Sequence, residues 1–203
     1  MHSRLIADVF HLPFPTNSFD TVVTDPPWHF ELRVSPRAKA VRATDYPLIS
    51  NQRMHAAFGE IYRVLKPGGH CYVFVPERKL RAALEIINSE RTGWEHFNTV
   101  AWVKLRRDGT DVRLGLGHTY RGAWEPILCL AKLRRRPLLR HDLPNVLFAP
   151  ADGGSRKPPE LYYTLVTAST APGGIVLDPF CGTDPLGRCG LTEYTTVSSD
   201  IAV

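Results

Sequence analysis

An acidic residue, two prolines and a tryptophan end the first strongly apolar stretch of the sequence, TVVTDPPW. Residues 21–24 are typical of a short buried strand, which must stop at Asp25 because Pro26 and Pro27 cannot continue a β-ladder. The prolines also restrict the backbone, so the Asp25 carboxylate and the Pro26 carbonyl are held side by side as acceptors. Trp28 adds a flat ring that can stack on a base. This corner suits an aromatic amine, although an ordinary turn above a core tryptophan explains the same four residues.

A second acid ends a later apolar run in the segment IVLDPFCGTDPLG, where Asp178 precedes a proline and a turn of small residues. Small residues let backbone N–H groups approach a ligand, and Asp178 can accept a hydrogen bond from it or pair with its charge. The next apolar segment, TTVSSD, ends at Asp200, where an acid is well placed to accept two ribose hydroxyls. The two acids favour a nucleoside site, although a structural turn and a solvated acid are the alternatives.

Strand and helix patterns alternate along the chain. We expect strands at 5–8, 21–25, 70–76, 98–105, 125–133, 173–180 and 195–200, and helices at 51–66, 77–90 and 158–170. The Gly- and Arg-rich residues 106–122 are typical of a loop in a hairpin-rich region. Continuous apolar strands alternating with helices predict an α/β fold with a seven-stranded, mostly parallel sheet between helices, whose functional residues lie at the carboxyl ends of the strands.

Length and composition indicate one domain. At 203 residues and 43% hydrophobic residues, the chain supports one substantial core, so we expect a single domain over residues 1–203 without a separate target-recognition domain. We find neither a secretory signal pattern nor an apolar run of the roughly 20 residues that a membrane helix needs, which favours a cytoplasmic protein with no membrane partner. The four cysteines form no C-x-x-C pair, so we expect no metal site.

The net charge of +5 favours a polyanionic partner. Two short basic segments contain the candidate phosphate contacts, although a solvated surface is the alternative: Arg33, Arg37, Lys39 and Arg42, and Arg134, Arg135, Arg136 and Arg140. Phosphate contacts position a nucleic acid without reading its sequence, so these residues predict affinity rather than specificity.

The order of the motifs resembles the β-group of amino-methyltransferases, which use S-adenosylmethionine to methylate the exocyclic amine of adenine or cytosine. The matching segments are LIADVFHLPFPTNSFDTVVTDPPW, EIYRVLKPGG, TVAWVK, YRGAWEPIL, SRKPPELYYTLV, GGIVLDPFCGT and VSSDIAV. In that group the DPPW-type motif precedes the DPF-x-G motif, which is a permutation of the commoner methyltransferase order. DYPLISNQRM and SRKPPEL are also similar to segments of the MT-A70-type adenine methyltransferases, which include RNA enzymes.

This resemblance implies a Rossmann-like methyltransferase fold and gives roles to individual residues. Asp25 and the Pro26 carbonyl would hold the hydrogens of the target amine within the catalytic motif Asp25, Pro26, Pro27 and Trp28, while Trp28 stacks the flipped base. Asp8 would bind the adenine amine of S-adenosylmethionine, Asp200 its ribose, and Asp178, Phe180, Cys181 and Gly182 its methionine part; Lys157 and Pro158 belong to the segment over the cofactor.

One motif departs from the family pattern. Relatives usually continue DPF-x-G with Ser-Gly-Thr, whereas this chain has Thr183, Asp184 and Pro185, which predicts a distorted or mobile turn. The leading hypothesis is an S-adenosylmethionine-dependent DNA adenine-N6 methyltransferase, because cytosine-N4 relatives more often carry Ser in place of Asp25. The alternatives are the same chemistry on RNA or cytosine N4, and a catalytically silent, nucleic-acid-binding subunit. DNA is favoured over RNA as the partner, and a homodimer or a partner subunit is left open.

Overall fold

The computed structural model describes residues 1–28, 49–89, 93–115, 118–151 and 156–200. Its strands form a single eight-stranded sheet in the order β1-β8-β7-β2-β3-β5-β4-β6. The strands are β1 (His2–Ile6), β2 (Phe19–Thr24), β3 (Leu65–Phe74), β4 (Trp94–Leu105), β5 (Trp124–Lys132), β6 (Val146–Pro150), β7 (Ile175–Asp178) and β8 (Thr195–Asp200). The structure therefore has one strand more than the seven that the sequence predicted.

The sheet is mostly parallel, as predicted, and β5 is the exception. It pairs antiparallel with β3 on one side and with β4 on the other, while every other neighbouring pair is parallel. The β4–β5 pair is a long hairpin closed by the predicted loop. The additional strand is β6, which pairs with β4 at the edge of the sheet, where its terminal Pro150 needs no ladder partner on the outer side.

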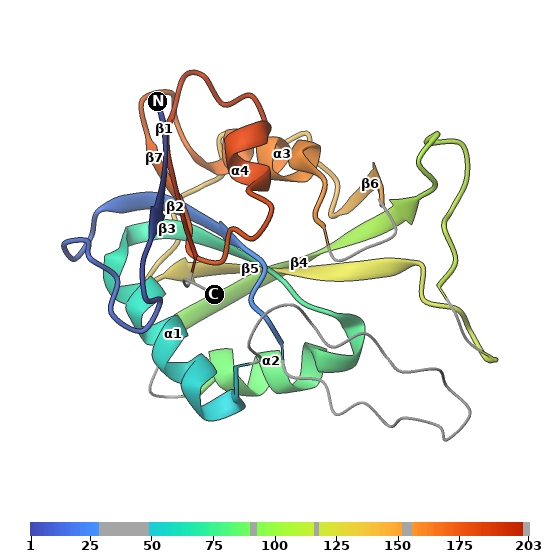
Figure 1. Ribbon diagram of the computed structural model, residues 1–203, viewed down its shortest axis with the longest axis horizontal. Coiled ribbons are helices and arrows are strands. Elements are labelled where there is room, and N and C mark those ends of the chain that lie inside the picture. The colour runs from blue at the N-terminus through green and yellow to red at the C-terminus, as the bar shows by residue number, and fades with distance from the viewer. Residues whose placement is uncertain (29–48, 90–92, 116–117, 152–155, 201–203) are drawn as a thin grey trace.

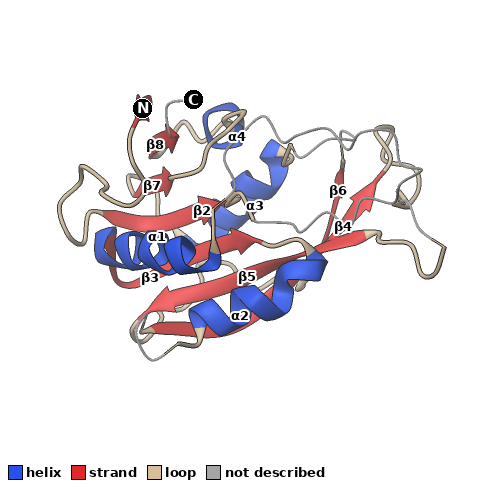
Figure 2. Cartoon of the chain, turned by 60° about the horizontal axis from the view of Figure 1, so that its bottom comes forward, coloured by secondary structure: helices blue, strands red, loops and turns tan. Residues whose placement is uncertain are grey.

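Helices cover both faces of the sheet (Figure 1). They are α1 (Asn51–Val64), α2 (Leu80–Ile87), which follows the 3-10 turn Glu77–Lys79, α3 (Pro159–Ser169) and α4 (Pro185–Arg188). Residues of α1 and α2 belong to one hydrophobic cluster, and residues of α3 and α4 belong to a second cluster on the opposite face. Figure 2 shows α1 and α2 lying along β3 and β5. Within the described ranges, no helix has the length and apolar character that spanning a membrane requires.

The ends of α1 and α3 illustrate how the sequence sets the boundaries. The Ser50 side chain accepts a hydrogen bond from the Arg53 backbone N–H and begins α1. We predicted that α1 would continue to residue 66, but Leu65 is already extended (φ −74°, ψ 138°) and begins β3. The predicted stop, Pro-Gly-Gly, is therefore part of a strand, in which Gly68 adopts φ 74°. Pro159 occupies the first turn of α3, where its missing N–H costs nothing.

Parallel pairing brings the predicted acids to one edge of the sheet. The strands β1, β8, β7 and β2 are consecutive parallel neighbours, so their carboxyl ends lie together. Asp200 and Asp178 are the last residues of β8 and β7, Asp25 directly follows β2, and Asp8 lies just after β1. This edge is the candidate active site.

Candidate active site

Asp25, at the end of β2, begins a tight corner. The Pro26 carbonyl accepts a hydrogen bond from the Trp28 backbone N–H at 2.9 Å, and the Pro27 carbonyl accepts one from the Ile49 N–H at 3.3 Å. A carbonyl oxygen has two lone pairs, so Pro26 retains acceptor capacity toward a ligand. The backbone after Asp25 is thus fixed by two hydrogen bonds as well as by two proline rings.

Trp28 supports this corner from inside the protein. Its side chain belongs to the core at 4% exposure, its Nε1–H donates to the Phe74 carbonyl at 3.0 Å, and its ring lies 6.4 Å from the ring of Phe58 on α1. This conformation does not present the ring face to solvent, in contrast to the expectation from sequence. Base stacking by Trp28 stays a prediction.

The partner of Asp25 is Lys157, which precedes α3. Its Nζ lies 2.7 Å from Asp25 Oδ2 and 3.0 Å from Glu125 Oε1 at the start of β5. Glu125 in turn contacts Lys104 Nζ on β4 through Oε2 at 2.7 Å. Sequence analysis placed Lys157 and Pro158 over the cofactor. In the structure Pro158 is the N-cap residue of α3 and Lys157 lies against the Asp25 corner.

Sequence analysis missed Glu125 and Lys104 as site residues. Glu125 is 6% exposed and stands in the apolar run WEPILCLA, so an acid at the start of a buried strand was the available indication. Its pairing with Lys157 could not be read from the sequence, because it depends on how the segment before α3 packs against β5.

Burial and neighbouring charges act in opposite directions on Asp25. Burial raises the pKa of Asp25 to about 6, with Lys157 lowering it and Glu125 raising it further. Burial alone would lower the pKa of Lys157, but Asp25 and Glu125 together hold it above its ordinary value. At neutral pH Asp25 is therefore mainly an ionised acceptor and Lys157 is a cation.

Asp178 provides a second buried carboxylate on the neighbouring strand. Its Oδ1 accepts a hydrogen bond from the Phe180 backbone N–H at 3.2 Å, whereas Oδ2 has no hydrogen-bond partner in the part of the chain that the structure describes. Burial raises the pKa of Asp178 to about 8; Phe180 and Tyr162 lower it, and the charge of Asp25 raises it. An unsatisfied buried carboxylate oxygen fits a ligand that brings a cation or an N–H donor.

The turn after β7 connects Asp178 with Asp200. The Cys181 N–H donates to the Ser199 carbonyl at 3.0 Å, and the Gly182 N–H donates to Asp200 Oδ2 at 2.8 Å. Gly182 adopts φ 46°, and a Cβ atom at this position would meet no atom within 4 Å. The turn thus has an open side at Gly182. One oxygen of the Asp200 carboxylate is already hydrogen-bonded to the turn and is not available to a ribose hydroxyl.

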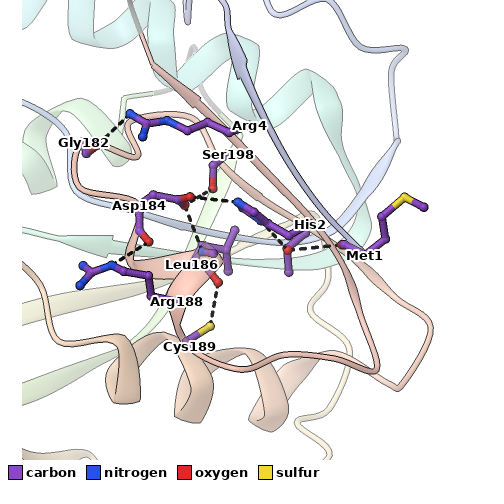
Figure 3. Close-up of polar contacts among 11 residues, drawn as sticks. Met1, His2, Arg4, Gly182, Asp184, Leu186, Arg188, Cys189 and Ser198 are labelled. Carbon is purple, nitrogen blue, oxygen red and sulfur yellow. Dashed lines mark hydrogen bonds and ion pairs between the residues drawn. The ribbon is translucent and has the colours of Figure 1, made fainter.

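The altered part of this turn is tied to the N-terminal strand (Figure 3). Asp184 stands where the family pattern has its second glycine and adopts φ 56°, a conformation that Asp tolerates better than most residues. Its carboxylate lies 2.9 Å from His2 Nε2, accepts from Ser198 Oγ at 2.6 Å and caps α4 through the Gly187 N–H at 3.0 Å. The sequence predicted a distorted or mobile turn, and the structure shows a turn in which Asp184 adopts a left-handed backbone conformation and is held by His2, Ser198 and the Gly187 N–H.

Asp8 lies at the same edge, in a more exposed setting. It follows β1, whose neighbour Ala7 donates its N–H to the Asp200 carbonyl at 3.1 Å. Asp8 Oδ1 accepts from the Phe10 N–H at 3.0 Å, which leaves the carboxylate at the surface beside the β1–β8 end of the site. Asp178 is buried and Asp25 and Asp200 are partly buried, so Asp8 is the most accessible of the four acids.

A protein-family comparison matches the model described as MT-A70 to residues 19–169, which is most of the chain. The chain belongs to the MT-A70 family. It is also 26% identical to the type II methyltransferase M.HpaI of Haemophilus parainfluenzae over 84% of this chain, and the chain spans 60% of the length of that relative.

Solved structures confirm the methyltransferase fold of this MT-A70 protein. The PvuII DNA methyltransferase (cytosine-N4-specific) matches with a TM-score of 0.71 at 16% identity, covering 99% of this chain and 82% of that chain. M1.HpyAVI in complex with S-adenosylmethionine matches with a TM-score of 0.70 at 17% identity, covering 100% and 94%. TTHA0409 of Thermus thermophilus, complexed with S-adenosylmethionine, gives 0.67 at 19% identity, covering 100% and 88%.

The predicted phosphate contacts that the structure describes, Arg134, Arg135, Arg136 and Arg140, do not gather at the edge with Asp25. Arg135 pairs with Glu95, Arg140 with Asp142, and Arg136 lies 3.7 Å from Asp20 at the opposite end of β2. Leu139, one residue before Arg140, bonds the carboxyl-terminal end of α3, away from Lys157. The predicted phosphate contacts of the segment from Arg134 to Arg140 therefore lie away from the Asp25 corner. The other predicted set, Arg33, Arg37, Lys39 and Arg42, falls outside the described residues.

Proposed function

We propose that this MT-A70 protein is an S-adenosylmethionine-dependent methyltransferase that acts on the exocyclic amine of adenine, at N6, in DNA. One observation carries the proposal: an acceptor corner at Asp25 and a buried carboxylate at Asp178, whose Oδ2 has no hydrogen-bond partner among the described residues, end adjacent parallel strands at the same edge of the sheet. The family membership and the fold shared with structures that contain S-adenosylmethionine support this assignment.

The cofactor would be held by the residues around the turn after β7. When bound, it supplies a methyl group on a sulfonium, which is already a good methyl donor. Asp178 Oδ2 would meet a positively charged or N–H group of the cofactor, and the open side of Gly182 admits the cofactor beside the backbone. Asp200 and Asp8, farther along the same edge, are the candidates for the ribose and adenine parts.

The Asp25 corner would then act on the amine. Hydrogen bonds from the two amine hydrogens to the Asp25 carboxylate and the Pro26 carbonyl direct the nitrogen lone pair toward the methyl group. The nitrogen would become cationic as it bonds the methyl carbon, while the methyl–sulfur bond breaks and the rest of the cofactor leaves as a neutral thioether. The ionised Asp25 carboxylate would stabilise the cationic nitrogen and accept the proton that it then releases. No covalent intermediate with the protein is needed.

The same geometry fits the N4 amine of cytosine, because Asp25 and Pro26 offer acceptors without reading the rest of the base. The cytosine-N4 specificity of the PvuII enzyme, whose fold this chain shares, supports this second candidate. We favour adenine because the corner carries Asp rather than Ser at position 25. RNA remains the alternative polymer, since MT-A70-type enzymes include RNA methyltransferases.

Transfer of a tritiated methyl group from S-adenosylmethionine tests the proposal directly. Four matched substrates separate the alternatives: DNA oligonucleotides lacking cytosine, DNA oligonucleotides lacking adenine, and the two corresponding RNAs. We expect incorporation into adenine-containing DNA, lost in Asp25→Asn, with nucleoside analysis identifying N6-methyladenine. Methylation of the adenine-free DNA alone would assign cytosine N4, and cofactor binding without transfer to any of the four would indicate a silent subunit.

A further inference from the structure

Four charged side chains, beginning with Asp25, form a continuous series of ion pairs. The contacts run from Asp25 to Lys157 at 2.7 Å, from Lys157 to Glu125 at 3.0 Å, and from Glu125 to Lys104 at 2.7 Å. The Lys157 and Glu125 side chains are each 8% exposed, so the two central members of the series are shielded from water. Charges that are this close and this well shielded from water interact strongly and are weakly screened by salt.

Lys157 is shared between two carboxylates. Its ammonium approaches one oxygen of Asp25 and one oxygen of Glu125, while the second Glu125 oxygen is bound by Lys104. A base that presents its amine to Asp25 competes with this ammonium for the same carboxylate. Glu125 gives Lys157 a second anionic partner. The ammonium can therefore lose its contact with Asp25 to the amine without being left as an unpaired buried charge.

We propose that Glu125 is a positioning residue which, through Lys157, sets the charge and the accessibility of Asp25 when the amine binds. This inference rests on the proposed function, because it gives Glu125 a role in methylation at Asp25. Glu125 itself does not touch the reacting atoms in this proposal; its action passes through the Lys157 ammonium.

Each neighbour of Asp25 has a defined effect on its titration. Lys157 and Lys104 lower the pKa of Asp25, and Glu125 raises it, as burial does. Two further groups in the described part of the chain interact electrostatically with Asp25, namely Asp178 on β7 and the Tyr162 hydroxyl on α3. Removing the Glu125 charge must therefore lower the pKa of Asp25 from about 6, and removing the Lys104 charge must raise it.

The test compares Glu125→Gln with Lys104→Met, because the two variants shift Asp25 in opposite directions. The activity readout is the acidic limb of the pH profile of methyl transfer. The second readout needs no cofactor: the carboxyl carbon of Asp25 is titrated by NMR in the protein alone and assigned by its loss in Asp25→Asn. Glu125→Asp keeps the charge, and Asp20→Asn is the matched control, since Asp20 is a lysine-paired carboxylate at the other end of β2.

We expect Glu125→Gln to move both the NMR titration and the acidic limb to lower pH by about one unit, as is typical for loss of a nearby like charge. Its maximal rate should fall at least several-fold because Lys157 then binds Asp25 alone, and Glu125→Asp should restore most of this loss. Lys104→Met should shift both curves upward, and Asp20→Asn should shift neither.

Unshifted Asp25 titration in folded Glu125→Gln would overturn the inference. If Glu125→Gln does not fold, a Lys104→Met titration that fails to move upward overturns it instead. Absence of methyl transfer in the wild type would refute the proposed function, and the NMR titration would still decide whether Glu125 controls Asp25.

Discussion

Strand β2 carries a partly buried acid at each end, and the two acids have opposite environments. Asp20, near the start of β2, accepts from Lys66 Nζ at 2.8 Å and from the Ile175 backbone N–H at 3.0 Å, with Arg136 at 3.7 Å. Although burial opposes the shift, these partners hold the pKa of Asp20 below its ordinary value. Asp25, directly after β2, shares its lysine partner with Glu125, and burial, aided by the Glu125 charge, raises the pKa of Asp25 to about 6 although Lys157 lowers it.

If the proposed function holds, the difference separates a carboxylate that stabilises the fold, Asp20, from one that takes part in the reaction, Asp25. Asp20 accepts hydrogen bonds from Lys66 and the Ile175 N–H, so its charge is compensated in the folded protein. Asp25 is incompletely compensated, which is unfavourable for stability but leaves the carboxylate responsive to a ligand that brings hydrogen-bond donors. Functional sites commonly contain such destabilised groups.

The largest expected difference between Asp25 and Asp20 is in the rate of methyl transfer, which should fall in Asp25→Asn. Removing one positioned charge from the amine site should lower the rate of methyl transfer by about 100- to 1,000-fold, because the transition state loses about 2.7–4 kcal/mol of stabilisation. Asp20→Asn should leave the rate near that of the wild type. Single-turnover assays with tritiated cofactor measure both variants, and equal losses in the two would remove the functional distinction.

The next effect concerns the affinity for S-adenosylmethionine. Asp178 must be ionised to pair with a cationic group, and its pKa of about 8 means that fewer molecules are ionised as the pH falls below that value. We expect the affinity to rise between pH 6 and pH 8, by up to about tenfold per pH unit. Calorimetric titration at several pH values measures this dependence.

Two variants test whether Asp178 causes that dependence. Asp178→Asn should bind more weakly and without the pH dependence. Asp200→Asn should also bind more weakly but should keep the dependence, because Asp178 is intact. An affinity that does not vary with pH in the wild type would show that Asp178 does not meet the charge of the cofactor.

The two ends of β2 should also differ in the sign of their effect on stability. Asp20 has a lowered pKa, so its stabilising contribution is present above the ordinary value of 3.8 and is lost as the pH falls through the lower folded value. Asp25 has a raised pKa, so ionising it costs folding free energy as the pH rises from 3.8 through about 6.

At pH 7, Asp20→Asn should therefore lower the free energy of unfolding, whereas Asp25→Asn should raise it, each by about 1–3 kcal/mol. Chemical denaturation and the melting temperature measure both changes, and a shift of roughly 2–4 °C per kcal/mol is expected for a chain of this size. If Asp25→Asn is destabilised as strongly as Asp20→Asn, the Asp25 corner is a structural turn of the kind that the sequence also allowed.

The sequence predicted much of this arrangement because strand-end acids follow from local patterns. Continuous apolar runs located β2, β3, β5, β7 and β8, and the parallel-sheet interpretation brought Asp25 and Asp178 to one edge. The short strand β6 was missed because VLFAP follows a Pro-containing segment, ends in proline and lies at the exposed edge. Its formation depends on the neighbouring β4, which the local pattern does not contain.

Ion pairs between distant segments were the least predictable feature. Glu125 meets Lys157, and Arg136 meets Asp20, only after β5, α3 and β2 have packed together. From composition alone, Arg134, Arg135 and Arg136 read as a basic patch for phosphates. The structure shows that Arg135 and Arg136 have acidic partners of their own, which a list of charges along the chain cannot reveal.

The smallest effect is therefore expected from replacing Arg134, Arg135 and Arg136 with alanine. Arg136 contacts Asp20 and the Gly68 carbonyl at the end of β2 that lies away from Asp25, and Arg135 is held by Glu95. The triple variant should lose stability, whereas the salt dependence of DNA binding should change by less than the slope of about 0.9 that one phosphate contact contributes.

The matched comparison replaces Arg33, Arg37, Lys39 and Arg42, which follow the catalytic motif in the sequence and were predicted to contact phosphates as well. Fluorescence anisotropy with duplex DNA at several salt concentrations measures both slopes. A loss of two or more phosphate equivalents in the Arg134–Arg136 variant would place the DNA backbone at the Asp20 end of the sheet, and the contrast between a structural and a functional end of β2 would no longer hold.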